Sequence, residues 1–306
     1  ADFDLTSENV SEWMKYWSNL SELIGEVGTS VYVATTVDTT DEEAKSRYHK
    51  FLEEISENVG SRNQVLKIKF LNSQVSPDNF DIPLRGIKSE VGLFSENNLP
   101  LLTSDAKLSK EYDAIIGSQT VTWEDDEVTL TQLSPVMLET DRDKREKAWK
   151  LASNRRLKDR KSINEIWEKV LKIRMSIAKN SNYEDYRDWR WEYLKRFDYT
   201  PDDCLIFHKS IEKVIVPLAD KLLKKRKEAL GLDKLKPWDL GVDIYGREAL
   251  TPFKDAKELE EKCHNIFTSV DPELGEHFGI MRKKNLLDLG NRKGKAPGGY
   301  CTEYPF

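Results

Sequence analysis

Apolar residues recur at intervals of three and four positions along most of this chain, and this spacing constrains its fold more than any other feature. In the first stretch they are Val10, Trp13, Met14, Trp17, Leu20, Ile24 and Val27. This spacing places the side chains on one face of an α-helix. Similar patterns predict helices around 84–94, 108–116 and 255–267, and a long, highly charged helical stretch over 141–179. The sequence therefore predicts a mainly α fold.

Capping signals define several of the expected helix ends. Thr40-Asp41-Glu42-Glu43 matches a capping box, and the helix that follows is expected to end at Gly60. Thr200-Pro201-Asp202-Asp203 is a stronger start, with a hydroxyl cap, a proline in the first turn and two acids. Pro217 is expected to kink the helix that begins there or to split it in two, because proline cannot donate a backbone hydrogen bond.

Two segments have the period of a strand instead. Thr120–Trp123 and Val128–Leu130 flank an acidic turn and predict one small β-hairpin. The last residues, Tyr304-Pro305-Phe306, follow a basic turn and a Pro-Gly-Gly break, and predict the start of a small sheet near the C-terminus. We interpret Phe306 as a cut edge, because chains do not normally stop on the first residues of a buried strand.

Composition excludes several classes of partner. The 306 residues are 38% hydrophobic and 33% charged, with a net charge of −6, so neither nucleic acid nor an anionic membrane is an expected partner. No run approaches the roughly 18 apolar residues that a membrane span needs, and residues 1–4 do not resemble the start of a signal peptide. The cysteines are widely separated, which favours a reducing cytoplasm over a disulfide framework; they are Cys204, Cys263 and Cys301.

No complete catalytic site is visible in the sequence. The four histidines form no H-E-x-x-H motif and no pair four residues apart on one helix; they are His49, His208, His264 and His277. Nucleophile-elbow, Walker A and G-x-G-x-x-G motifs are also missing from the sequence. The aromatic cluster between Tyr183 and Tyr193 is either a stacking surface or part of the core, and core is the more usual role at helical spacing. This chain alone is therefore expected to bind no catalytic zinc and to cleave no peptide.

Several segments, in this order, resemble the oligoendopeptidase F branch of the thimet-oligopeptidase-like zinc metallopeptidases. The likeness covers nearly the whole chain and is strongest from Leu138 onward. The segments that carry it are Glu139–Arg142, Asn182–Arg187, Arg196–Cys204, Val216–Leu218, Leu235–Leu240, Val270–Gly275 and Arg292–Tyr300.

The resemblance implies a helical, bowl-shaped metallopeptidase lobe, and it assigns two parts of the chain to different domains. Residues 1–196 would form the N-terminal helical lobe, and residues 197–306 the first part of the catalytic domain. In this family the K-x-P-G-G-Y segment precedes a strand and then the helix with H-E-x-x-H, whose histidines bind zinc together with a downstream glutamate. All these groups would lie beyond Phe306.

The implied activity is hydrolysis of internal bonds in short peptides, with zinc in the complete enzyme. The implied partners are short peptides and the chain's own C-terminal catalytic segment. The alternative is a non-catalytic helical binding or scaffold protein that keeps a peptidase lobe.

The candidate substrate-binding residues are Gly298, Gly299, Tyr300 and Cys301. Successive glycines let another backbone approach closely, so an extended peptide could pair with this segment along the substrate channel. Lys293 and Lys295 would then stand near the channel mouth. The other interpretation, a tight turn between two elements, stays open.

Overall fold

The computed structural model describes residues 4–305, and 68% of these residues are helical. The chain divides into two compact units, each built from separate stretches of sequence. The first comprises Ala1–Gly117, Arg160–Lys213 and Ala296–Phe306, and the second Ser118–Asp159 and Val214–Lys295. The predicted functional division between residues 196 and 197 stays a prediction. Among residues 4–305, no helix is both long enough and apolar enough to cross a bilayer.

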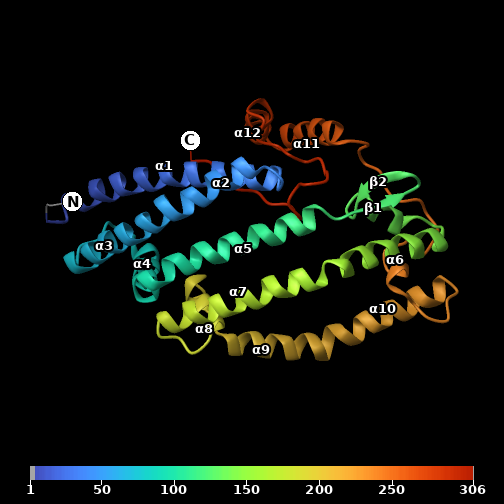
Figure 1. The fold of residues 1–306 in the computed structure, drawn as a ribbon, viewed down its shortest axis with the longest axis horizontal. Coiled ribbons are helices and arrows are strands. Elements are labelled where there is room, and N and C mark those ends of the chain that lie inside the picture. The colour runs from blue at the N-terminus through green and yellow to red at the C-terminus, as the bar shows by residue number, and fades with distance from the viewer. Residues whose placement is uncertain (1–3, 306) are drawn as a thin grey trace. The chain divides into compact units, whose positions relative to one another are not determined.

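In the described residues of the first unit, all regular elements are helices (Figure 1). Its elements are α1 Val10–Val37, α2 Glu42–Lys50, η1 Phe51–Ser56, α3 Glu57–Ser73, α4 Asp81–Leu93, η2 Glu96–Asn98, α5 Leu99–Gly117, α7 Arg160–Asn180, α8 Tyr186–Tyr193 and α9 Pro201–Ser210. The π-helical turn η1 joins α2 to α3 in one continuous helical run.

Three clusters of buried apolar residues hold this unit together. Val10 and Trp13 of α1 pack with Phe70 of α3, and the Trp13 and Phe70 rings stack at 6.3 Å. A second cluster joins α4, α7 and α8, and a third lies between α5 and α7, which run side by side in Figure 1. The predicted apolar face of α1 is only partly covered, since Leu20 is 54% and Val27 43% exposed.

The predicted helix end at Gly60 is wrong, because the helix continues to Ser73. A Cβ at position 60 would lie 2.8 Å from Cδ2 of Leu99, so the glycine lets α5 approach α3 closely rather than ending the helix. The chain instead leaves the helix at Gln74, whose φ of 58° is left-handed.

The second unit combines the β-hairpin with the remaining helices. Its elements are β1 Thr120–Trp123, β2 Asp126–Thr129, η3 Ser134–Leu138, α6 Arg142–Lys158, α10 Val216–Ala229, η5 Pro237–Asp239, α11 Ala256–Val270 and α12 Pro272–Lys283. The predicted hairpin is confirmed: Thr120 pairs with Thr129 and Trp123 with Asp126. The loop has two residues, Glu124 and Asp125, both with positive φ, as a type I′ turn requires.

The start of a second sheet near the C-terminus is not found in the described residues. Tyr304 and Pro305 pair with no strand, and Phe306 lies outside the described part of the chain. The expected effect of Pro217 takes a milder form than a break. The π-helical turn η4, Ile211–Ile215, separates α9 from α10, because Pro217 has no N–H to donate to the carbonyl four residues earlier.

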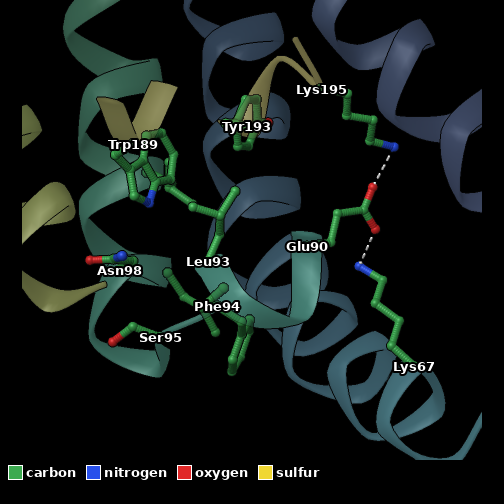
Figure 2. A pocket seen from close by; sticks show the side chains of 11 residues that line it. Lys67, Glu90, Leu93, Phe94, Ser95, Asn98, Trp189, Tyr193 and Lys195 are labelled. Carbon is green, nitrogen blue, oxygen red and sulfur yellow. Dashed lines mark ion pairs between the residues drawn. The ribbon is translucent and has the colours of Figure 1, made fainter. Parts of the chain in front are cut away.

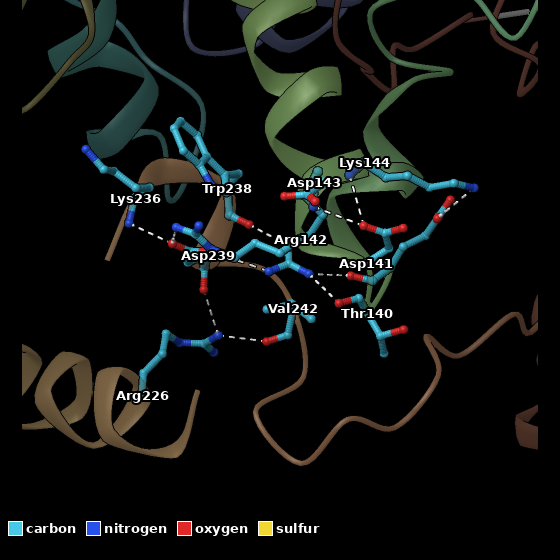
Figure 3. A network of polar contacts seen from close by, with 12 residues as sticks. Thr140, Asp141, Arg142, Asp143, Lys144, Arg226, Lys236, Trp238, Asp239 and Val242 are labelled. Carbon is cyan, nitrogen blue, oxygen red and sulfur yellow. Dashed lines mark hydrogen bonds and ion pairs between the residues drawn. The ribbon is translucent and has the colours of Figure 1, made fainter. Parts of the chain in front are cut away.

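A buried carboxylate joins the loop around η5 to α6 (Figure 3). Asp239 is 0% exposed and accepts from Arg142 Nε at 2.9 Å and Nη2 at 3.0 Å. Arg145, 2% exposed, donates to Asp239 at 3.3 Å and to the Trp238 carbonyl at 2.8 Å. Arg226 of α10 donates to the Asp239 and Val242 carbonyls. Because a buried charge is costly without partners, these contacts hold the loop in one position. We refer to them as the Asp239 network.

The Asp239 network makes stability depend on pH. Burial alone would raise the pKa of Asp239, but hydrogen bonds from Arg142 and the Lys236 backbone outweigh burial and hold it below its usual value. A lowered folded-state pKa gives stability that is present above the unfolded-state pKa of about 4 and is lost as pH falls through the folded value.

We expect Asp239→Asn to lower the free energy of unfolding at pH 7 by about 3 kcal/mol, because it leaves buried guanidinium charge without a carboxylate. Urea unfolding followed by tryptophan fluorescence should show the gap to wild type shrinking as pH falls below about 4. The exposed Asp143→Asn in α6 is the control. A gap of unchanged size down to pH 3 would contradict the assignment.

A second expectation concerns the crossing of α11 and α12. A Cβ at Gly275 would lie 2.8 Å from Cα of Thr268, so backbone must move, whereas one at Gly279 would lie 3.5 Å from Cε1 of His264, an ordinary contact. Gly275→Ala should therefore destabilise the protein by about 1–3 kcal/mol, and Gly279→Ala should stabilise it by up to about 1 kcal/mol through helix propensity. Urea unfolding of both variants tests this, and shifts in the same direction would refute it.

Candidate functional site

The four predicted substrate-binding residues form one continuous exposed segment. Gly298, Gly299, Tyr300 and Cys301 are all exposed, and they follow a bend at Pro297-Gly298. Gly298 has a φ of 83°, so a glycine is needed there for the turn itself. From Gly299 onward the described residues have no helix or strand assignment. The structure therefore shows a turn at Gly298, and the substrate-binding role of the exposed stretch after it stays a prediction.

The space above the two glycines is open within the described residues. A Cβ added at Gly298 or Gly299 would meet no atom within 4 Å. Close packing inside this part of the chain therefore does not require a glycine at 299. The open space is what a ligand backbone would need if it lay against the segment.

Tyr300 fixes this segment to α1. The Ala296 amide donates to the Thr36 carbonyl at 2.9 Å, and the Tyr300 hydroxyl lies 2.5 Å from Oγ1 of Thr36. Since Thr36 Oγ1 donates its single proton to the Val33 carbonyl, Tyr300 is the donor of the shared bond. These contacts hold the backbone on both sides of Gly298 and Gly299.

A buried polar and aromatic cluster lies beneath Tyr300. The Tyr32 ring is 6.0 Å from the Tyr300 ring and 5.9 Å from the Tyr48 ring. Lys110, 7% exposed, places its Nζ 4.0 Å from the centre of the Tyr32 ring and pairs with Asp113 at 2.9 Å. Burial, followed by the neighbouring Tyr32 and Asp113, raises the pKa of Tyr48 to about 12, so its hydroxyl stays neutral at physiological pH. The cluster gives Tyr300 a rigid support.

The two lysines before the segment lie in the second unit and have partners there. Lys293 pairs with Glu127 of β2 at 2.8 Å. Lys295 donates to the carbonyls of Asp288 at 2.6 Å and Gly290 at 2.9 Å, which holds the turn around Gly294. Both lysines thus have structural contacts inside the second unit, and their expected place at a channel mouth stays a prediction.

A metal site does not form in the part of the chain that the structure describes. Within residues 4–305, no three His, Cys, Asp or Glu side chains gather closely enough to hold a metal ion. His264, for example, packs its ring against Phe278 at 6.4 Å in the α11–α12 pair. These residues therefore do not fit the zinc that the family resemblance implies.

Sequence reasoning missed the residues that hold the segment. Thr36 and Tyr32 precede Tyr300 by more than 260 positions, and neither belongs to a recognisable motif. The end of α1 contains one aromatic residue, Tyr32, followed by Thr35 and Thr36, and this pattern gave no signal of an interaction surface.

A family model and several solved structures match this chain. The family model for peptidase family M3 matches residues 136–305. The structure of PZ peptidase A with an inhibitor is similar over 98% of this chain and 54% of that chain, with 28% identity and a TM-score of 0.90. A candidate oligoendopeptidase F from Bacillus anthracis strain Ames shares the fold, with a TM-score of 0.88 and 23% identity over 98% of this chain and 55% of that chain.

One shorter match is of a different kind. A tRNA-specific 2-thiouridylase MnmA from Ralstonia pickettii is 31% identical over 122 residues, which are 37% of this chain and 31% of the relative. The chain thus spans less than a third of that curated relative and about half of each solved peptidase. The likeness to the solved peptidases, in contrast, extends over 98% of this chain.

Tyr300→Phe should loosen the 296–301 segment without unfolding the protein. Loss of the bond to Thr36 should speed amide hydrogen exchange at Ala296, while the free energy of unfolding falls by only about 1 kcal/mol. Thr36→Val should give the same local effect, and the double variant should add little, because both remove one bond. Tyr245→Phe, at an exposed tyrosine of the second unit, is the control. Unchanged exchange at Ala296 would contradict the assignment.

Proposed function

Because this chain belongs to peptidase family M3, we propose that it works as part of a zinc metallo-oligopeptidase that hydrolyses internal bonds of short peptides. The observation that carries the proposal is the match of fold to PZ peptidase A over 98% of the chain, together with the family model over residues 136–305. The oligoendopeptidase F likeness of the sequence motifs supports the same substrate class.

The zinc ligands belong, in this proposal, to polypeptide outside these 306 residues. Two facts support this: the sequence contains no H-E-x-x-H motif, and solved relatives have nearly half of their length beyond what this chain matches. The described residues supply the framework on which that part acts. The separated cysteines, all free in the structure, support the cytoplasm as the compartment.

The segment Gly298–Cys301 binds the substrate backbone. Its support is physical: the residues are exposed, nothing in the described chain occupies the space above the glycines, and Tyr300 holds the segment on α1. A peptide lying along Gly299–Cys301 could exchange main-chain hydrogen bonds with it, which gives affinity without demanding a particular side chain. Broad acceptance of short peptides follows from such binding.

In this proposal, the polypeptide that carries the zinc ligands covers the apolar face of α9 and that of α10. We call it the partner polypeptide. Neither helix has a buried residue. In α9, Ile206 is 63% and Phe207 64% exposed, and in α10, Leu218 is 52% and Leu222 58% exposed. Exposed apolar side chains of this number are a mark of interaction surfaces. We assign each of these two faces, taken separately, to the part of the M3 fold that carries the metal site.

The test combines residues 1–306 with the part of PZ peptidase A that this chain does not match. The chain alone should hold no stoichiometric zinc after dialysis and should not cleave a quenched fluorescent peptide. The combination should form a complex with chelator-sensitive cleavage. Stable complex formation without any cleavage would favour the scaffold alternative, and zinc-dependent cleavage by the chain alone would overturn the assignment of the ligands to the partner.

Gly299→Val should separate substrate binding from folding. A Cβ at position 299 meets no atom of the described chain within 4 Å, so stability should change by less than about 0.5 kcal/mol. The kcat/KM of the active complex should fall at least about tenfold, which corresponds to a barrier increase of about 1.4 kcal/mol. Gly290→Ala, another glycine with open space around it, is the control. Unchanged kcat/KM in folded Gly299→Val would leave only a turn at this position.

A further inference from the structure

A recess lies in the first unit, and none of its lining residues belongs to the segment that carries the proposed function. It has a volume of about 490 Å³ and opens among α3, α4, α5 and α8 (Figure 2). This is within the range of roughly 300–1,000 Å³ typical of small-molecule sites. One wall is polar and consists of Lys67, Glu90 and Lys195, and the other is largely apolar.

The polar wall has an excess of one positive charge. Glu90 pairs with Lys67 at 2.8 Å and with Lys195 at 2.7 Å. Burial alone would raise the pKa of Glu90, but hydrogen bonds from the two lysines outweigh burial and hold it below its usual value, so the carboxylate is ionised. Each ammonium has three N–H donors, and Glu90 uses one from each. The wall can therefore accept one further carboxylate, which would also balance its charge.

The opposite wall suits an aromatic or branched apolar group. Trp189 forms its base at 2% exposure, and the Tyr193 ring stacks on Trp189 at 5.0 Å. Tyr193 is 48% and Leu102 38% exposed, so apolar surface remains for a ligand to cover. Asn98 is fully engaged, because it donates to the Ile177 carbonyl and Ser181 and accepts from Asn180. Specificity for charge therefore comes from the two lysines.

We propose that this recess binds a monocarboxylate that bears an aromatic or branched aliphatic group. Its carboxylate would accept from the N–H donors of Lys67 and Lys195 that Glu90 leaves unused, and its apolar group would lie against Tyr193 and Leu102. The carboxyl terminus of a short peptide and a free small acid share this chemistry. The inference goes beyond the proposed hydrolysis and does not depend on it.

Gly86 of α4 offers a way to move Lys195 without changing any charge. A Cβ at position 86 would lie 3.2 Å from Nζ and 3.4 Å from Cε of Lys195, so the lysine must shift. Gly92 of the same helix has no atom within 4 Å of an added Cβ. Gly86→Ala and Gly92→Ala are thus matched variants that gain the same helix propensity, and only the first disturbs the recess.

The experiment is isothermal titration calorimetry of the 306-residue chain with N-acetyl-L-phenylalanine. The corresponding amide, N-acetyl-L-phenylalaninamide, should bind at least about tenfold more weakly, because it lacks the negative charge that the two lysines would contact. Lys67→Met and Lys195→Met should each weaken binding of the acid by about tenfold, and Gly86→Ala should weaken it severalfold. Lys88→Met, at an exposed lysine outside the recess, and Gly92→Ala should bind as wild type does, with folding checked by circular dichroism.

A capped peptide of four alanines ending in free phenylalanine separates the two sources. Tighter binding than the free acid assigns the recess to peptide termini, and equal binding assigns it to small acids. Equal binding of acid and amide, or wild-type affinity in both lysine variants, would overturn the proposal. Because the assay needs neither zinc nor cleavage, its failure would leave the proposed peptidase function untouched, and loss of cleavage would leave the recess untouched.

Discussion

A long amphipathic helix is stable in water only where another element covers its apolar face, and this constraint accounts for most of the structure. In the first unit the faces of α1, α3, α4, α5, α7 and α8 meet in three buried clusters. In α9 and α10 the same kind of face remains exposed. Since tertiary packing supplies most helix stability in proteins, these two helices need a covering surface. In our proposal the partner polypeptide would supply it.

Buried or half-buried charge is the second determinant, and close partners compensate it at three places. Asp239 meets two arginines, Lys110 meets Asp113 and the face of Tyr32, and Glu90 meets two lysines. The first arrangement is closed, because Asp239 has no exposed surface. The third is open to a recess and retains spare donors. That difference separates a purely structural ion pair from a candidate binding site.

Many of the motif residues that reveal the family have structural tasks. Thr200 and Asp203 form a capping box, Asp271 caps α12, and Gly275 permits the close crossing of α11 and α12. Trp238-Asp239 holds a loop against α6. Gly299 differs, since within the described residues neither packing nor a positive φ requires a glycine there. A residue whose identity no structural contact requires is the better candidate for a functional role.

The sequence alone determined the elements, because periodicity, caps and turn residues act over a few neighbours. It predicted the mainly α fold, the hairpin of Thr120–Trp123 and Val128–Leu130, and the helix start at Thr200. It misplaced the helix end at Gly60, because the reason for that glycine is the Leu99 side chain 39 positions away. Only the tertiary structure brought Thr36 to Tyr300, Arg142 to Asp239, and Lys67 and Lys195 to Glu90. Such pairs depend on which helix faces pack together, and local patterns carry no information about partners so distant in the chain.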